Sequence, residues 1–290
     1  MKRLLIFIFL LGCIAPFYAQ QSRLGVTTDA SLVWQIDDID NTTAKTGAAL
    51  SIGGLYQFQN KKFLMQLGLG FSPAWLRTGI HSQNFVVDML DTEGVPFTHI
   101  GSINKRTDLI TAMDLTVPLM VGFTVDGVYV LMGAKVNVTV SGKTNQKAYL
   151  TTVGDYGDRY YGVFENMPEH GFYNEKLIQS KGEIQLRPDL HICAEVGWNT
   201  PLPIYARRSN APRLLLGAFF EYGVLNTLDK DNELFTEVDY SQHMQVHMNN
   251  IFTTFDRGEV LLNNIRAGIR ATILFPLRSR EERICDCIKD

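Results

Sequence analysis

The feature that most constrains this chain is a strict alternation of apolar and polar residues, which recurs in eight segments. In the first segment, one set of alternate positions carries Leu24, Val26 and Leu32 and contains no charge. A helix would mix the two sets on each face, whereas a β-strand separates them, so the pattern predicts strands. The segments span residues 23–36, 48–58, 63–75, 109–125, 128–140, 182–198, 214–224 and 265–275.

The two faces of these predicted strands have different chemistry. The apolar faces carry no charge, so we expect them to be buried or to contact lipid. The opposite faces carry Arg23, Lys62, Lys135, Arg187, Arg213, Arg266 and Arg270, together with Asp29, Asp114, Glu183, Asp189, Glu195 and Glu221. A soluble sandwich would turn these charges to water, whereas a membrane barrel would turn them to its lumen.

The connections favour the barrel, because short and long ones alternate along the chain. Asn60-Lys61 and Asp126-Gly127 predict tight hairpins, and a proline-rich segment, 200–211, joins the sixth and seventh strands. The long connections span about residues 37–46, 76–108, 142–181 and 227–262. Short periplasmic turns and long extracellular loops are typical of outer-membrane barrels, and this assignment places the N-terminus in the periplasm.

Expected pairings and aromatic residues agree with this topology. Val125 is predicted to pair with Val128 on the apolar face, and Gln59 with Lys62 on the polar face. Two aromatic girdles are predicted: Phe58, Phe63, Phe123, Trp198 and Phe275 near the periplasmic rim, and Trp34, Trp75 and Tyr222 near the outer rim. Two prolines fall inside predicted strands. Pro118 lies within the membrane and predicts a β-bulge, whereas Pro188 lies near the outer rim.

Composition excludes two classes of protein. The formal net charge is −3, so the chain lacks the basic balance that nucleic-acid binding needs. Beyond the first 20 residues, no apolar run approaches the roughly 20 residues of a membrane-spanning helix. The mean hydropathy of −0.01 is compatible with a membrane barrel, because lipid-facing and lumen-facing residues average to a value near zero.

The first residues are typical of a secretory signal peptide. Lys2 and Arg3 precede an apolar run over 4–11, and Ala19 is a suitable cleavage position. We therefore expect a signal peptide over residues 1–19, a barrel over 20–277 and a short periplasmic tail over 278–290.

The segments 114–123 (Asp-Leu-Thr-Val-Pro-Leu-Met-Val-Gly-Phe) and 129–135 (Tyr-Val-Leu-Met-Gly-Ala-Lys) carry a family resemblance. The chain resembles small outer-membrane β-barrel proteins of Gram-negative bacteria and is most similar to the PorT-like barrels. Those barrels commonly have an apolar-Pro-Leu-Leu strand followed by a tyrosine-containing strand that ends in small residues. The resemblance covers about residues 22–277 and implies an outer-membrane barrel, with a role in protein secretion for some members. The strand count is also similar to OmpA- and OmpX-like barrels.

The lumen charges allow two interpretations. Eight strands enclose an interior just wide enough for side chains to fill it, so we favour a salt-bridged plug. The alternative is a narrow gated pore or proton path through Asp29, Asp114, Lys135, Arg187, Glu195 and Arg270.

An enzymatic role, such as lipid A modification, is the rival hypothesis. Its candidate groups would be His81 with Ser82, or His243 and His247 with Asp239 and Ser241. The pair His243 and His247 shares one face of an extended strand, which would suit a metal ion. No acyl-transfer or zinc motif supports either set, and Cys193, Cys285 and Cys287 have neither zinc spacing nor a disulfide framework.

The predicted loop over residues 149–173 is rich in aromatic side chains. They are Tyr149, Tyr156, Tyr160, Tyr161, Phe164, Phe172 and Tyr173. Exposed aromatics beside charged residues are typical of binding surfaces, but the same residues would also pack a loop against itself. The sequence leaves both interpretations open.

The sequence thus predicts an all-β fold, an eight-stranded antiparallel up-and-down transmembrane β-barrel with long extracellular loops. We expect an outer-membrane protein without catalytic residues, metal or cofactor, acting in surface interaction, envelope integrity or as a secretion accessory. The expected partners are outer-membrane lipid and lipopolysaccharide, and extracellular or secretion-system proteins bound through the loops. Nucleic acid is not an expected partner. The alternatives are a lipid A-modifying enzyme and a narrow gated pore.

Overall fold

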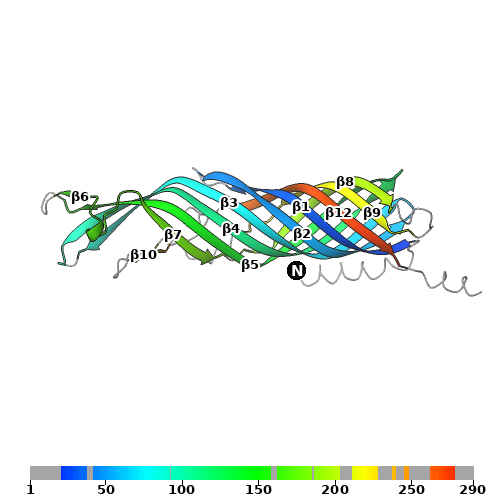
Figure 1. Cartoon of the computed structure of the whole chain (residues 1–290), viewed down its shortest axis with the longest axis horizontal. Helices are drawn as coiled ribbons and strands as arrows, with labels where there is room; N and C mark the ends of the chain where they lie inside the picture. The colour runs from blue at the N-terminus through cyan, green and yellow to red at the C-terminus, as the bar shows by residue number, and fades with distance from the viewer. Residues whose placement is uncertain are drawn as a thin grey trace, which may run out of the picture.

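The computed structural model is an elongated, almost entirely antiparallel β structure (Figure 1). It describes residues 21–37, 42–91, 93–157, 162–184, 186–202, 211–227, 237–239, 245–247 and 262–277. The predicted signal peptide and periplasmic tail, with Cys285 and Cys287, lie outside the described residues. Within those ranges, no helix is long and apolar enough to cross a membrane.

Eight strands form a closed ring in the order β1-β2-β3-β4-β5-β8-β9-β12, and β12 pairs with β1. Their bounds are β1 (Gln21–Asp37), β2 (Thr42–Asn60), β3 (Phe63–Leu90), β4 (Pro96–Val125), β5 (Val128–Asp155), β8 (Asp189–Pro201), β9 (Arg213–Gly223) and β12 (Leu262–Pro276). The remaining elements are β6 (Val163–Glu165), the 3-10 helix η2 (Pro168–His170), β7 (Lys176–Glu183), β10 (Glu237–Asp239) and β11 (Gln245–His247). Each of the eight predicted segments overlaps one ring strand, so the predicted barrel is confirmed.

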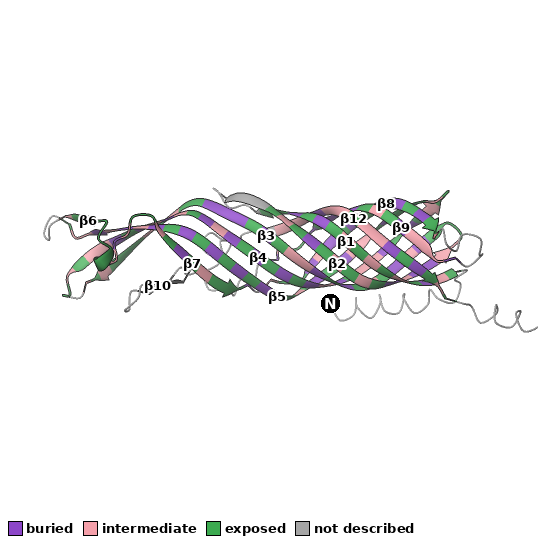
Figure 2. Ribbon diagram, viewed as in Figure 1, coloured by how far each residue is buried: buried purple, intermediate pink, exposed green. Residues whose placement is uncertain are grey.

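Burial alternates along the ring strands, and buried and exposed bands therefore follow each other along every ribbon (Figure 2). The outward positions form an apolar belt that includes Val26, Leu50, Leu69, Phe71, Val121, Val130, Met132, Ile192, Phe220 and Ile269, all exposed. The inward positions carry the charged residues, which are mostly buried. This arrangement inverts that of a soluble protein and is the one that lipid requires.

The predicted girdles lie at the two ends of the belt. Phe63 pairs with Phe123 beside the short turns, with ring centroids 6.0 Å apart. Trp34 pairs with Ile265, which in turn pairs with Tyr222, at the outer end. Phe58 is the exception among the predicted girdle residues, because it is buried.

The two hairpin predictions have different outcomes. Val125 pairs with Val128 around Asp126-Gly127, as predicted. In the first hairpin, Asn60 pairs with Phe63, so the turn is Lys61-Lys62 and the predicted Asn60-Lys61 turn is wrong by one residue. A slip of two residues in the pairing leaves each side chain on the same face, so the apolar pattern could not distinguish the two registers.

The two strand prolines are accommodated without the predicted irregularity. At Pro118 the pairing of β3 with β4 is interrupted, but the register is the same on both sides, so the predicted β-bulge is absent. A Cβ on Gly68 would lie 3.1 Å from Pro118 Cγ, and glycine at this position therefore makes room for the ring. Pro188 lies just before β8 and not inside a strand.

Strands β3, β4 and β5 contain 28, 30 and 28 residues, whereas a membrane span needs only about 10. The predicted loops over 76–108 and 142–181 are therefore mostly strands. We call the part beyond the belt the extension; it comprises Arg77–Leu90, Pro96–Leu109 and Lys143–Asp155, with β6, η2 and β7. It projects beyond the ring at the end opposite the short turns (Figure 1).

Strand β5 changes its partner along its length. It pairs with β8 inside the ring and with β7 in the extension, so the predicted sixth strand over 182–198 is divided. A register shift between Met113 and Asp114 lies opposite Val140 of β5. Outward positions on β5 are even up to Val140 and odd from Ser141, so this irregularity ends the apolar belt on β5.

Candidate functional site

The lumen is filled by three layers of side chains. The layer nearest the short turns contains an apolar cluster of Leu55, Leu64, Met120, Tyr129, Leu131, Cys193, Leu215 and Leu274. Every one of these side chains is buried, and the buried polar side chains of Arg23, Gln57, Gln66 and Asn199 lie at the same end of the barrel. These side chains occupy inward positions of the ring strands, and the charged residues occupy other inward positions of the same strands. The sequence pattern therefore assigned both groups to one face.

The middle layer is a lumen charge network centred on Arg270. The Arg270 guanidinium donates to Glu195 at 2.6 Å, to Glu221 at 3.2 Å and to Asp29 at 3.3 Å. Glu195 also accepts a hydrogen bond from the Tyr129 hydroxyl at 2.6 Å. These contacts join β1, β5, β8, β9 and β12, so the network ties together strands on opposite sides of the ring.

Three further contacts between ionisable side chains extend this network toward the outer end. Lys135 pairs with Glu221. His191 Nε2 lies 2.7 Å from Asp189 Oδ2, and Arg266 donates to Asp114 at 2.9 Å. Burial of the Lys135, Glu221, Arg266 and Asp114 charges is tolerable because each one faces a partner of opposite sign.

The outer layer is an apolar plug that a non-strand segment completes. Ile184 lies in the link between β7 and β8 and packs with Val33, Ala49, Leu76 and Ile110. The Ile184 amide donates to the Gly142 carbonyl, which fixes the link to β5. Leu186 packs against the same cluster, so we call Ile184 and Leu186 the outer plug.

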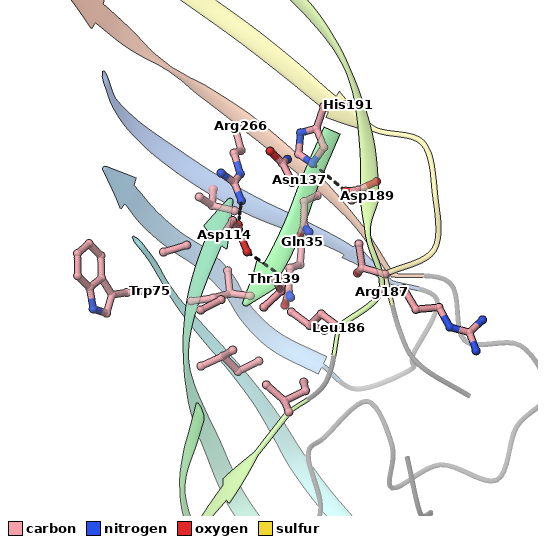
Figure 3. A pocket seen from close by; sticks show the side chains of 18 residues that line it. Gln35, Trp75, Asp114, Asn137, Thr139, Leu186, Arg187, Asp189, His191 and Arg266 are labelled. Atoms are coloured by element: carbon pink, nitrogen blue, oxygen red, sulfur yellow. Dashed lines mark hydrogen bonds and ion pairs between the residues drawn. The ribbon is translucent and has the colours of Figure 1, made fainter. Parts of the chain in front are cut away.

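A small cavity of about 60 Å³, lined by both polar and apolar side chains, lies beneath the outer plug (Figure 3). Asn137 is 4% exposed, and neither its amide nitrogen nor its amide oxygen has a hydrogen-bond partner. Gln35 Oε1, His191 Nδ1 and Arg266 Nε are also unpartnered there. A water needs roughly 10–15 Å³ of such space and two or more polar partners, so the cavity suits a small cluster of waters.

The described network contains more acid than base. Its carboxylates are Asp29, Asp114, Asp189, Glu195 and Glu221, and its Lys and Arg side chains are Lys135, Arg266 and Arg270. His191 lies between two of these carboxylates, with Nδ1 3.7 Å from Glu221 Oε2. A hydrated cavity beside His191 would screen the excess negative charge.

The structure brings together most of the residues predicted to line a lumen path. Asp29, Lys135, Glu195 and Arg270 meet through Glu221, and Asp114 pairs with Arg266. Arg187 does not join them, because its side chain is exposed and points away from the cavity (Figure 3). These contacts cross the lumen, and they pair opposite charges there as the plug interpretation predicts.

Sequence reasoning missed two parts of this site. His191 has the inward parity of β8, next to Asp189 and Cys193, and that parity was the available signal. In the predicted strand 182–198, Ile184 and Leu186 have the same parity as the outward Ile192, so the alternation predicts that they face lipid. This prediction is wrong, because both pack in the outer plug. The chain leaves the sheet after Glu183, so alternation no longer reports the direction of a side chain there.

The proposed catalytic sets are not assembled in the described residues. His81 and Ser82 are both exposed neighbours on β3. Asp239 pairs with Gln245, and His247 pairs with Glu237, in the β10–β11 hairpin. Ser241 and His243 lie outside the described residues. Among the residues that the structure describes, no group of His, Cys, Asp and Glu side chains is placed to hold a metal ion.

The aromatic residues of the extension pack mainly against one another. Tyr156 stacks on Phe97 with centroids 4.8 Å apart, and Phe164 meets Tyr156 edge-on at 5.3 Å. Phe172 is buried, and a Cβ on Gly154 would clash with its ring. Tyr160 and Tyr161 lie outside the described residues. Of the two interpretations left open, packing describes Tyr156, Phe164 and Phe172.

The extension is expected to lose stability as the pH falls below about 6.5. His99 is 1% exposed and lies between the rings of Phe85, Phe97 and Phe172. Burial lowers the pKa of His99 below its ordinary value of 6.5. Above pH 6.5, His99 is neutral in both the folded and the opened forms. Between pH 6.5 and the lowered pKa, only the opened form gains a proton on His99, so the extension loses stability over that range.

Hydrogen exchange at the amides of His99, Ile100 and Gly101 measures this effect at about pH 7.5 and about pH 5, after correction for intrinsic rates. Protection should be lower at the acidic pH. The variant His99→Phe keeps an aromatic ring and should show no such pH dependence. An equal dependence in that variant would assign the effect to another group.

The chain was also compared with known proteins. No family model matches the sequence, and no curated protein matches it. Among solved structures, the chain is similar to Ail, the attachment invasion locus protein of Yersinia pestis, in its complex with the heparin analogue sucrose octasulfate. The match has 10% identity and a TM-score of 0.26, and it covers 87% of this chain and 99% of that chain.

Proposed function

We propose that this chain is a non-catalytic outer-membrane protein whose sealed barrel anchors the extension as a binding surface for another protein outside the cell. The observation that carries the proposal is the contrast between the two parts. Three layers of side chains occupy the lumen, while three strands continue beyond the belt for more than the length of a membrane span. A barrel that conducts or transports would need an open lumen and would not need a long extension.

The free edge of β3 supports a protein partner. Beyond Ile80, β3 pairs with β4 on one side, and within the described residues no strand pairs with its other side. The exposed residues of this edge include Val86 and Leu90, at 64% and 67%. An unpaired, apolar strand edge is a template for addition of a strand from another protein.

Two alternatives to this proposal differ in their support. The resemblance of residues 114–123 to PorT-like barrels favours a secretion-system protein as the partner that adds the strand. Lipid A modification has less support, because His81 and Ser82 are exposed on β3 and no metal-holding group is found among the described residues.

Site-specific photo-crosslinking on intact cells tests the partner. A photoreactive residue at Val86 is expected to give a discrete heavier adduct, and the same residue at lipid-facing Val140, 66% exposed, is not. Lysines repel strand addition at an edge, so the changes Val86→Lys and Leu90→Lys should abolish an adduct formed from Asn84. Leu177→Lys is the matched control, because it adds the same charge on β7, which pairs with β5 at the opposite edge of the extension, and it should leave the adduct intact.

Three results would overturn the proposal. The first is the absence of any adduct along residues 81–90. The second is stable conductance steps from the purified protein in planar bilayers, which would favour the pore. The third is an altered acyl pattern of lipid A in a deletion strain, which would favour the enzyme.

A further inference from the structure

The outward face of the barrel changes from apolar to basic at one level. On β3 the exposed Trp75 is followed, two residues later, by the exposed Arg77. On β5 the apolar belt ends at Val140, and the next charged outward residue is Lys143. The change therefore occurs where the belt meets the extension, at the outer girdle.

Strand register gathers four cations at this level. Arg77 pairs with Leu109, Leu109 with Asn145, and Asn145 with Lys181, so one row crosses four strands. Lys143 and Lys147 lie two residues before and after Asn145 on β5. Neighbouring strands are about 4.8 Å apart and residues rise by about 3.3 Å, so the four positions lie within roughly 15 Å of one another. We call Arg77, Lys143, Lys147 and Lys181 the basic patch.

The basic patch differs from the charges in the lumen. Its four side chains are exposed, and no ion pair within 4.0 Å joins any of them to a described carboxylate. In the rows of paired residues that pass through Lys143, Asn145 and Lys147, the outward positions of the described residues carry a single acidic side chain, Glu183, opposite Lys143. The patch therefore has excess positive charge directed away from the barrel, beside an aromatic girdle.

We propose that the basic patch binds the phosphate groups of a glycolipid in the outer leaflet of the membrane. Long Lys and Arg side chains at the edge of a lipid belt keep their stems on the apolar surface and place their charges at the headgroups. Phosphate oxygens accept hydrogen bonds from both ammonium and guanidinium groups. The inference rests on the proposed outer-membrane placement, but not on the protein partner of the extension.

The test compares lipid binding by three versions of the full chain in nanodiscs, with bisphosphorylated and dephosphorylated lipid A as probes. The first is the native chain. The second carries Gln at Arg77, Lys143, Lys147 and Lys181. The control loses the same number of charges elsewhere, through Lys61→Gln, Lys62→Gln, Lys105→Gln and Lys176→Gln. Native mass spectrometry counts the bound lipid, and heat-modifiable gel migration shows that each version is folded.

We expect the native chain and the control to prefer bisphosphorylated lipid A, and the patch variant to lose at least about tenfold of that preference. Inorganic phosphate should not compete. Equal binding of both lipids by a folded native chain, equal preference in the patch variant, or displacement by inorganic phosphate would each overturn this inference. Such results leave the partner proposal intact, because photo-crosslinking at Val86 measures a different surface.

Discussion

Replacing Arg270 with methionine is expected to lower the free energy of unfolding by about 3–5 kcal/mol. The guanidinium contacts Asp29, Glu195 and Glu221, and its removal would leave Asp29 and Glu195 buried without a cation. Lys135 would still pair with Glu221. Methionine fills similar space, so the loss reports orphaned charge more than an empty volume.

Urea unfolding in detergent, followed by heat-modifiable gel migration, measures this difference. The matched control is Arg77→Met, which removes an exposed guanidinium and should change stability by about 0.5 kcal/mol or less. Adding Asp29→Asn and Glu195→Gln to the Arg270 variant should recover part of the loss, because the amides carry no charge. A loss below about 1 kcal/mol would show that water enters the lumen and that the network does not seal it.

Replacing Ile184 with alanine is expected to open the outer plug. Replacing a buried isoleucine with alanine lowers stability by about 2–5 kcal/mol. Here the stability that is lost is that of the link between β7 and β8, which lies outside the sheet. Since about 1.4 kcal/mol corresponds to tenfold, solvent access to the cavity beneath should rise by about 30-fold or more.

A cysteine introduced at Asn137 reports this access in a background where the native cysteines are serine. Its reaction with a water-soluble maleimide should be slow in the parent and faster in the Ile184→Ala variant. Leu177→Ala, on the outward face of β7, is the control, because its side chain is 51% exposed and outside the plug. Equal rates in all three proteins would mean that solvent reaches the cavity by another route.

The ring could be predicted because lipid imposes one strict condition on half of its residues. Positions such as Leu69 and Val130 face lipid, so a charge there is excluded and the alternation is clear. The extension is free of that condition. At Val86 and Val87, consecutive residues are both exposed, and the two-residue period that identified the ring strands is lost.

The sequence predicted which charged residues face the lumen, but only some of the contacts between them. Inward parity placed Asp29, Glu195 and Arg270 in the lumen, because a strand fixes the face of each residue. Parity gives no information on which strands are neighbours across the lumen, so the central position of Glu221 was not foreseen. The outer plug depends on Ile184 in a link, where neither period nor pairing directs the side chain.

The unbroken course of β3, β4 and β5 has a mechanical consequence. Each of these strands runs from a short turn to the far end of the extension without a hinge, and the pairings of β3 with β4 and of β4 with β5 continue with few irregularities. A force that pulls on a partner bound at the far end of the extension would act parallel to the strands. It would load all of the hydrogen bonds between the strands at once. The barrel would therefore carry tensile load as a single body, with the girdles of Phe63 and Trp75 resisting its extraction from the bilayer.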